Sequence, residues 1–208
     1  MEARIREAEG SAFQDMIAAM DSLRTVFDVV GAPREWLTGR YLASASEFPD
    51  VAEYWVRYQA YVDELRDRDE EFFRRGFYRR LLNSGIDGPV RSMRLASATE
   101  EFASQAPARE ELYTAMDGIA GVALELHELL VENEDAIVYT PVRPGVVTQN
   151  PVLEAVPTEG ELRDRLWDTL DRLFEQVDVV RGGVPGSGEQ LGEAALEGIR
   201  ATTNPREP

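Results

Sequence analysis

The sequence contains no cysteine and no lysine, and its single histidine is His127. Without cysteine, the chain can form neither a disulfide nor a thiolate nucleophile. A catalytic serine would need a histidine base and a turn that presents its hydroxyl, but no G-x-S-x-G elbow is present. His127 lies in the helical run LELHELLVE, where its neighbours Glu125 and Glu128 predict an ordinary solvated face. We therefore expect no catalytic residues and a protein that is not an enzyme.

The motifs of metal and nucleotide sites are also missing. Helical di-iron sites use Glu-x-x-His on two helices, but Leu124 stands three residues before the only histidine. The acidic residues within 132–135 lack the central glycine and the terminal glutamate of an EF-hand loop. The run from Gly183 keeps the glycine spacing of a phosphate-binding loop, but Glu189 and Gln190 replace its lysine and its hydroxyl residue. We expect no specific metal and no cofactor.

Long apolar runs are absent as well, and none approaches the ~20 residues that a membrane-spanning helix needs. The first ten residues, MEARIREAEG, are charged throughout and lack the apolar stretch of a signal peptide. These features predict a soluble, cytoplasmic protein with no membrane contact. Hydrophobic residues still make up 43% of the chain, which is enough to build a core.

The charge of the chain is strongly one-sided. Its net charge of −17 comes from 39 acidic and 22 basic residues, and all of the basic residues are arginine. In molar salt the screening length falls to about 3 Å, so such a surface stays soluble without strong self-repulsion. This composition is typical of a halophilic archaeon. A GC-rich mesophilic genome, which also favours arginine codons, is the alternative.

Hydrophobic spacing predicts an all-α fold, with a bundle of three to four long helices in residues 1–134. A first helix, ended by Gly31, is predicted by a seam with the alternating three-and-four spacing of a heptad: Phe13, Met16, Met20, Leu23, Phe27 and Val30. A second seam of this kind predicts a helix over 108–133: Leu112, Met116, Ile119, Ala123, Leu126 and Leu130. For each helix, the seam fits either an intramolecular core or packing between subunits.

Turn and capping residues mark the other helices of this region. A short helix is expected over 33–41. A longer one begins in a capping-box arrangement at Asp50 and is expected to continue to the glycines before Pro89, unless Gly76 kinks it. Another short helix is expected over 97–105.

The last third of the chain differs in composition. Residues 135–157 contain four prolines and little helical periodicity, which predicts an extended Pro-rich arm. Residues 158–208 are expected to form a C-terminal helical appendage. Within it, a helix should cover 158–180, followed by a flexible linker over 181–188, a weakly amphipathic helix and a polar tail.

One segment reverses the charge of the chain. Residues 72–99 hold six arginines and one acidic residue, and aromatic side chains lie between the arginines. Arginine binds carboxylate and phosphate groups through a planar fork, so this segment predicts contact with a negative surface. Pairing with the protein's own acidic helices is the alternative. The candidate partner-binding residues are Arg74, Arg75, Arg79, Arg80, Arg91, Arg94, Phe77 and Tyr78.

This order of helices, extended arm and C-terminal segment resembles that of the head–tail connector, or adaptor, proteins of tailed viruses. The resemblance implies a homo-oligomeric ring that docks on a portal ring, without catalysis and with nucleic acid as an incidental partner. The long first helices depart from that pattern and leave another minor virion role open. The alternatives are a host cytoplasmic adaptor or regulator that binds a protein through 72–99, and an enzyme that uses glutamate and arginine alone.

Overall fold

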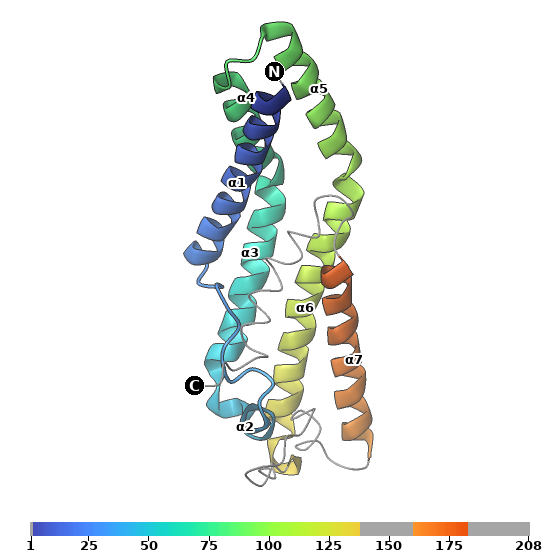
Figure 1. Cartoon of the computed structure of the whole chain (residues 1–208). Coiled ribbons are helices and arrows are strands. Elements are labelled where there is room, and N and C mark those ends of the chain that lie inside the picture. Colours follow the sequence, from blue (N-terminus) through green and yellow to red (C-terminus); the bar gives the residue numbers. More distant parts are fainter. Residues whose placement is uncertain (1, 138–159, 183–208) are drawn as a thin grey trace, which may run out of the picture.

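The computed structural model describes residues 2–137 and 160–182, and these residues form helices and connecting turns without any strand. The predicted all-α class is therefore confirmed for this part of the chain (Figure 1). The elements are α1 (Glu2–Val26), α2 (Gly39–Ala43), α3 (Pro49–Phe73), a π-helical turn called here the π segment (Arg74–Tyr78), α4 (Arg79–Asn83), α5 (Gly88–Ser104), α6 (Ala106–Glu132) and α7 (Glu161–Gly182), with short 3₁₀ helices at Ala45–Glu47 and Glu134–Ala136.

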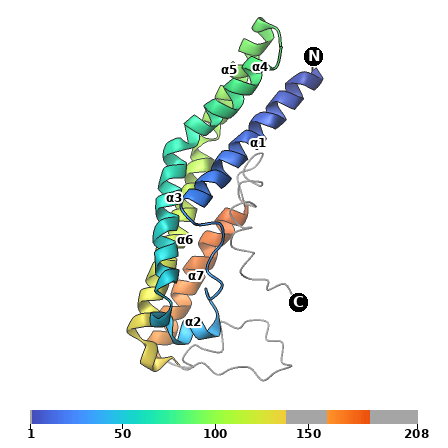
Figure 2. The ribbon, with the colours of Figure 1, turned by 90° about the vertical axis from the view of Figure 1, so that its left-hand side faces the viewer.

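The helices form an elongated rod with α4 at one end and α2 at the other (Figure 1). The chain rises through α3, the π segment and α4, and it returns through α5 and α6. On one face of this pair, α1 covers the half toward α4, and α7 covers the half toward α2 (Figure 2). Arginines of residues 72–99 therefore lie toward the α4 end.

The π segment continues α3 into α4 without a break, and at Gly76 it lies close to α1. An ideal Cβ on Gly76 would lie 2.8 Å from the carbonyl oxygen of Ala12, so only glycine lets the backbone of α1 approach this closely. A π turn holds one extra residue and rotates the side chains that follow it. At Gly76, where the sequence left a kink open, the structure therefore has a π turn that widens one long helix locally.

The first helix ends earlier than its apolar seam predicts. After Val26 the chain leaves the helix, with Asp28 in the left-handed region at a φ of 55°. The N–H of Val29 donates to the carbonyl of Arg24, and Val29 is buried, whereas Val30 is 61% exposed. The expectation that the helix continues to Gly31 with Val30 on its seam was therefore wrong.

The helix expected over 97–105 is longer, because α5 begins at Gly88. Gly85, with a φ of 65°, ends α4, and Pro89 occupies the first turn of α5. The Gly-Pro pair expected to end one helix instead begins the next, as suits proline at a helix N-terminus. None of the residues of α5 is buried, which makes it the least packed of the longer described helices.

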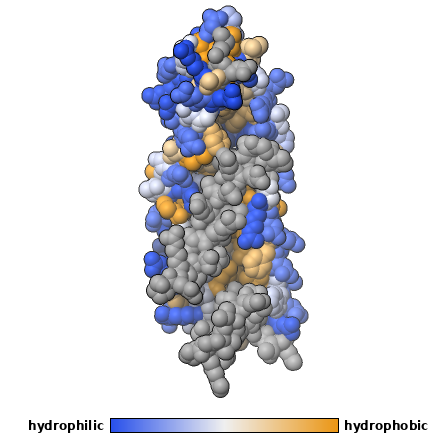
Figure 3. Space-filling view, viewed as in Figure 1, coloured by the Kyte–Doolittle hydropathy of each residue, from blue (hydrophilic) through white to orange (hydrophobic). Residues whose placement is uncertain are grey.

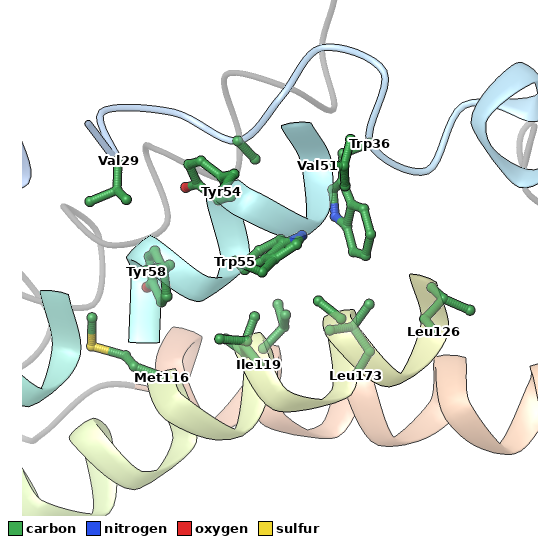
Figure 4. Close-up of a cluster of buried hydrophobic side chains, with 14 of the residues drawn as sticks. Val29, Trp36, Val51, Tyr54, Trp55, Tyr58, Met116, Ile119, Leu126 and Leu173 are labelled. Carbon is green, nitrogen blue, oxygen red and sulfur yellow. The ribbon is translucent and has the colours of Figure 1, made fainter. Parts of the chain in front are cut away.

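The main core lies between α3, α6 and α7 and is rich in aromatic rings. Trp55 of α3 packs edge-on against Trp36, at 5.1 Å between ring centroids, and against Tyr58, at 5.5 Å (Figure 4). The seam predicted for 108–133 is buried along α6 and faces these rings. Burial raises the pKa of Tyr54 to about 12 and that of Tyr58 further, so these hydroxyls stay protonated.

A smaller core lies at the α4 end, where Ile5, Ala8, Leu81 and Ile86 are buried together. Hydrophilic residues form most of the described surface in Figure 3, and apolar residues show in patches along the rod. Ile137, at the start of the expected arm, is buried in the main core. Residues 135 and 136, also expected to be extended, belong to the 3₁₀ helix Glu134–Ala136. Residues 138–157 of the expected arm, residues 183–188 of the expected linker and the last expected helix lie outside the described residues.

Candidate functional site: an arginine groove at the π segment

Three of the predicted site residues, Arg75, Arg79 and Arg80, line one groove between α1 and the π segment with α4. The groove has a volume of about 560 Å³. We call it the arginine groove, and its lining is Asp15, Ala18, Ala19, Phe72, Arg75, Gly76, Arg79, Arg80 and Asn83. Arg75 and Arg79 are four residues apart and so share the helix face that lies toward α1.

Arg80 is held in place by α1. Its Nε and Nη2 each donate to a carboxylate oxygen of Asp15 at 2.7 Å, which is the bidentate geometry of a strong charged pair. This hydrogen bond lowers the pKa of Asp15, and the charge of Arg79 lowers it further. One arginine of the groove therefore serves the contact between α1 and α4.

The other two arginines of the groove are exposed at its rim. Arg75 is 75% exposed and pairs with Glu71, one turn earlier on α3. Arg79 is exposed, and within the described residues it forms no ion pair. Exposed pairs within one helix contribute only about 0.3–0.5 kcal/mol, so a partner's carboxylates can replace Glu71 at small cost. The groove can bind an anionic group by two guanidinium forks.

The structure separates the remaining predicted residues from this groove. Arg74 pairs with Glu70 and, with Tyr78, lines a second groove toward α5 and α6. Phe77 is half-buried and stacks on Phe73. The last two, Arg91 and Arg94, lie on α5, and neither forms an ion pair within the described residues.

A buried polar cluster escaped the sequence-based prediction. Arg109 of α6 is 7% exposed; its Nε donates to Asp69 of α3 at 2.7 Å, and its Nη1 donates to the carbonyl of Phe102 at 2.6 Å. The hydroxyl of Tyr113 donates to the other oxygen of Asp69 at 2.9 Å. The interruption of an apolar seam by Asp69 was the only sequence signal for this cluster. It joins helices and lies apart from the arginine groove.

His127 is not on an ordinary solvated face, contrary to the prediction. It is half-buried, and its Nδ1 lies 2.9 Å from the hydroxyl of Tyr41, whose ring stacks beside the imidazole. Burial lowers the pKa of His127, so the ring stays neutral to lower pH than a free histidine. The histidine thus ties α2 to α6, while Glu125 and Glu128 beside it are exposed as expected.

A groove of the opposite charge lies between α6 and α7. It has a volume of about 770 Å³, and it is lined by six carboxylates and two arginines. Arg172 pairs with Glu125 across the groove, which leaves most of the carboxylates exposed: Glu128, Glu132, Asp168, Asp171 and Glu175. We call it the acidic groove. The rod therefore carries an arginine groove toward α4 and an acidic groove toward α2.

Within residues 2–137 and 160–182, no group of three or more His, Asp or Glu side chains is arranged to hold a metal ion. In the same part of the chain, no helix combines the length and the apolar character that crossing a membrane requires. Comparison of the sequence and the structure with protein-family models, curated proteins and solved structures found no match.

Proposed function

We propose that this protein is a non-enzymatic structural subunit that assembles with other copies of itself. The arginine groove of one copy binds the acidic groove of the next. The observation that carries the proposal is the convergence of Arg75 and Arg79 on one groove of a chain whose net charge is −17.

The two grooves are complementary in charge and lie on different parts of the rod. Joining one to the other between copies creates a head-to-tail interface, which closes into a ring when the rotation allows it. Paired arginine and carboxylate groups that lose water on docking give specificity even where salt screens distant charges. The excess of exposed carboxylates in the acidic groove leaves acceptors for both guanidinium groups.

The narrower assignment is a head–tail connector, neck or other minor structural protein of a tailed virus that infects a halophilic archaeon. Its support is the resemblance in sequence organisation and the acidic, lysine-free composition. In this role, a bundle of long helices forms the body of the subunit, the Pro-rich residues 135–157 contact neighbouring subunits, and a portal ring is a further partner. Nucleic acid contact is incidental.

Light scattering coupled to size exclusion in molar KCl tests self-assembly. We expect the wild type to elute as a multimer. The double variant Arg75→Glu with Arg79→Glu should elute as a monomer, because a carboxylate facing carboxylates weakens association by about 2–5 kcal/mol. Its melting temperature should stay close to that of the wild type, since both side chains are exposed.

A matched control is Arg34→Glu with Arg181→Glu, which makes the same change in net charge at exposed positions outside both grooves. This control should assemble like the wild type. A wild type that stays monomeric would contradict self-assembly and favour the adaptor or regulator that binds another protein. If the Arg75→Glu, Arg79→Glu variant assembles normally but has a lower melting temperature than the wild type, the two arginines stabilise the fold of the subunit and not an interface.

A further inference from the structure

A cavity of about 170 Å³ lies between α1, α3, α5 and the start of α6, and it shares only Phe72 with the arginine groove. Its walls are mainly aromatic and thioether side chains. The described part of α1 contributes Phe13, Met16 and Met20, which lie at helical spacing and are only partly buried. These residues belong to the seam predicted from the sequence; Met16 and Met20 pack against the main core and also line this cavity.

The opposite wall comes from the π segment and α5. Phe73 stacks between Phe77, at 5.2 Å, and Phe102, at 4.1 Å between ring centroids. All three rings line the cavity. Ring faces and edges favour another aromatic ring in offset or edge-on contact. Methionine side chains on the facing helix can adjust to such a ring and contact it through sulfur.

One end of the cavity is polar, and the charges of its buried cluster are paired. Asp69 accepts from Arg109 and Tyr113, and the guanidinium of Arg109 also lies 3.6 Å from the centre of the Phe102 ring. A charged ligand would find no unpaired countercharge in this cluster, and burying an unpaired charge is costly. The remaining charge of the lining is the exposed carboxylate of Glu101, which repels an anion. The lining therefore favours a neutral ligand over an anionic one.

The size of the cavity sets the size of the ligand. An apolar cavity of about 150 Å³ accommodates benzene. From the volume, the aromatic lining and the paired charges, we propose that this cavity is a binding site for a small, neutral, single-ring aromatic molecule. The site is independent of the proposed assembly role, because none of its residues lines the acidic groove and only Phe72 is shared with the arginine groove.

Toluene is the probe for this site, and methionine methyl groups report on it. The chain has five methionines. Met16 and Met20 line the cavity, whereas Met93 is 64% exposed and Met116 is buried in the main core. In ¹³C-methyl spectra, we expect toluene to shift the signals of Met16 and Met20 saturably. The signals of Met93 and Met116 should stay in place.

Benzoate is the matched charged probe, because a carboxylate replaces the methyl group of toluene. We expect it to bind at least about tenfold more weakly, since its charge would be buried without a partner. The variant Ala98→Phe places a ring in the cavity from α5 and should abolish the toluene shifts. Ala96→Phe, on the exposed side of the same helix, should leave them unchanged.

The melting temperatures of both variants identify any loss of folding. The proposal is overturned if toluene gives no saturable shift up to its solubility limit, or if all four methyl signals move together. It is also overturned if folded Ala98→Phe binds toluene as the wild type does, or if benzoate binds as tightly as toluene.

Discussion

Arg109 shows how much a single charged residue can contribute when its environment is closed. Its guanidinium is almost fully buried, and three polar groups depend on one another around it: Arg109, Asp69 and Tyr113. Arginines elsewhere on α3 and in the π segment form ion pairs in water, where the same chemistry contributes little. Burial, and not the number of ion pairs, decides which arginines hold the fold.

Replacing Arg109 with methionine should therefore lower the free energy of unfolding by about 3 kcal/mol, because it leaves the Asp69 carboxylate without its charged partner. This value is at the low end of the range for buried ion pairs, because the Asp69 side chain is still 23% exposed to solvent. Urea denaturation at fixed salt measures this change.

Arg74→Met is the control, because the Arg74–Glu70 pair is about two-thirds exposed on both sides. Its loss should not exceed about 0.5 kcal/mol. Equal losses for the two variants would contradict a special role for the buried cluster.

His127 gives the protein a defined response to pH. Burial lowers its pKa from the ordinary value, so between the folded and unfolded pKa values the unfolded chain binds more protons. The stabilisation that depends on a neutral His127 is fully present above about pH 6.5. It is lost as the pH falls through the pKa that His127 has in the folded protein. We expect the free energy of unfolding to fall from pH 6.5 to 5.5, before most carboxylates titrate.

His127→Gln removes the titrating ring and keeps a side chain that can accept the hydroxyl of Tyr41. Chemical denaturation at half-unit pH steps should show a flatter profile for this variant in the same interval. Because the chain has no other histidine, an unchanged slope would exclude His127 as its source.

At the level of the elements, the contact between α1 and the π segment depends on the missing side chain of Gly76. Gly76→Ala would place a methyl group 2.8 Å from the carbonyl oxygen of Ala12, and a backbone atom cannot move aside as a flexible side chain can. We expect this variant to lose about 1–3 kcal/mol of stability, as overpacked sites do. Thermal or urea denaturation measures the loss.

Gly10→Ala on α1 is the matched control. An added Cβ there meets nothing within 4 Å, and the position is inside a helix. This substitution should stabilise the protein by about 0.5–1 kcal/mol, because alanine loses less conformational entropy than glycine in a helix. Stabilisation by both substitutions would mean that α1 does not approach the π segment closely.

Elements with a regular seam were predictable from the sequence. The residues predicted for α6 are buried at every position, because burial on one side of a long helix imposes its period on the sequence. The Gly-Pro pair that begins α5 was misassigned, because the same two residues suit the end of one helix and the start of another. The end of α1 before its seam was complete was not predicted, although aspartate, here Asp28, is one of the residues that adopt the left-handed conformation most readily.

The candidate site was predictable in part. The arginines of 72–99 stand out in an acidic chain, and helical spacing places Arg75 and Arg79, four residues apart, on one face, as they are in the groove. The sequence did not show that α1 forms the other wall of the groove or that Asp15 pairs with Arg80. The pairing of Arg109 with Asp69 joins residues 40 apart in the chain and has no local periodicity.

At the scale of the whole molecule, the net charge of −17 should make stability depend on salt. Repulsion between carboxylates acts over about 10 Å at 0.1 M salt and over about 3 Å at 1 M. We expect the melting temperature to rise steadily from low salt to molar KCl and the fold to loosen below a few hundred millimolar.

Choline chloride at the same concentrations separates screening from binding of potassium. Screening alone should raise the melting temperature equally in both salts. A melting temperature that is the same at low and at molar salt would contradict the halophilic origin expected from the composition.

The absence of buried residues in α5 has a consequence for how the rod opens. Amide hydrogens exchange with solvent through the least costly opening that exposes them, and helices with few buried contacts open in subglobal steps. The amides of α5 should therefore exchange much faster than those of α3 and α6, which lose protection only on global unfolding. The rod would then behave as two foldons in one chain, and the arginine groove, which no residue of α5 lines, would stay intact when α5 opens.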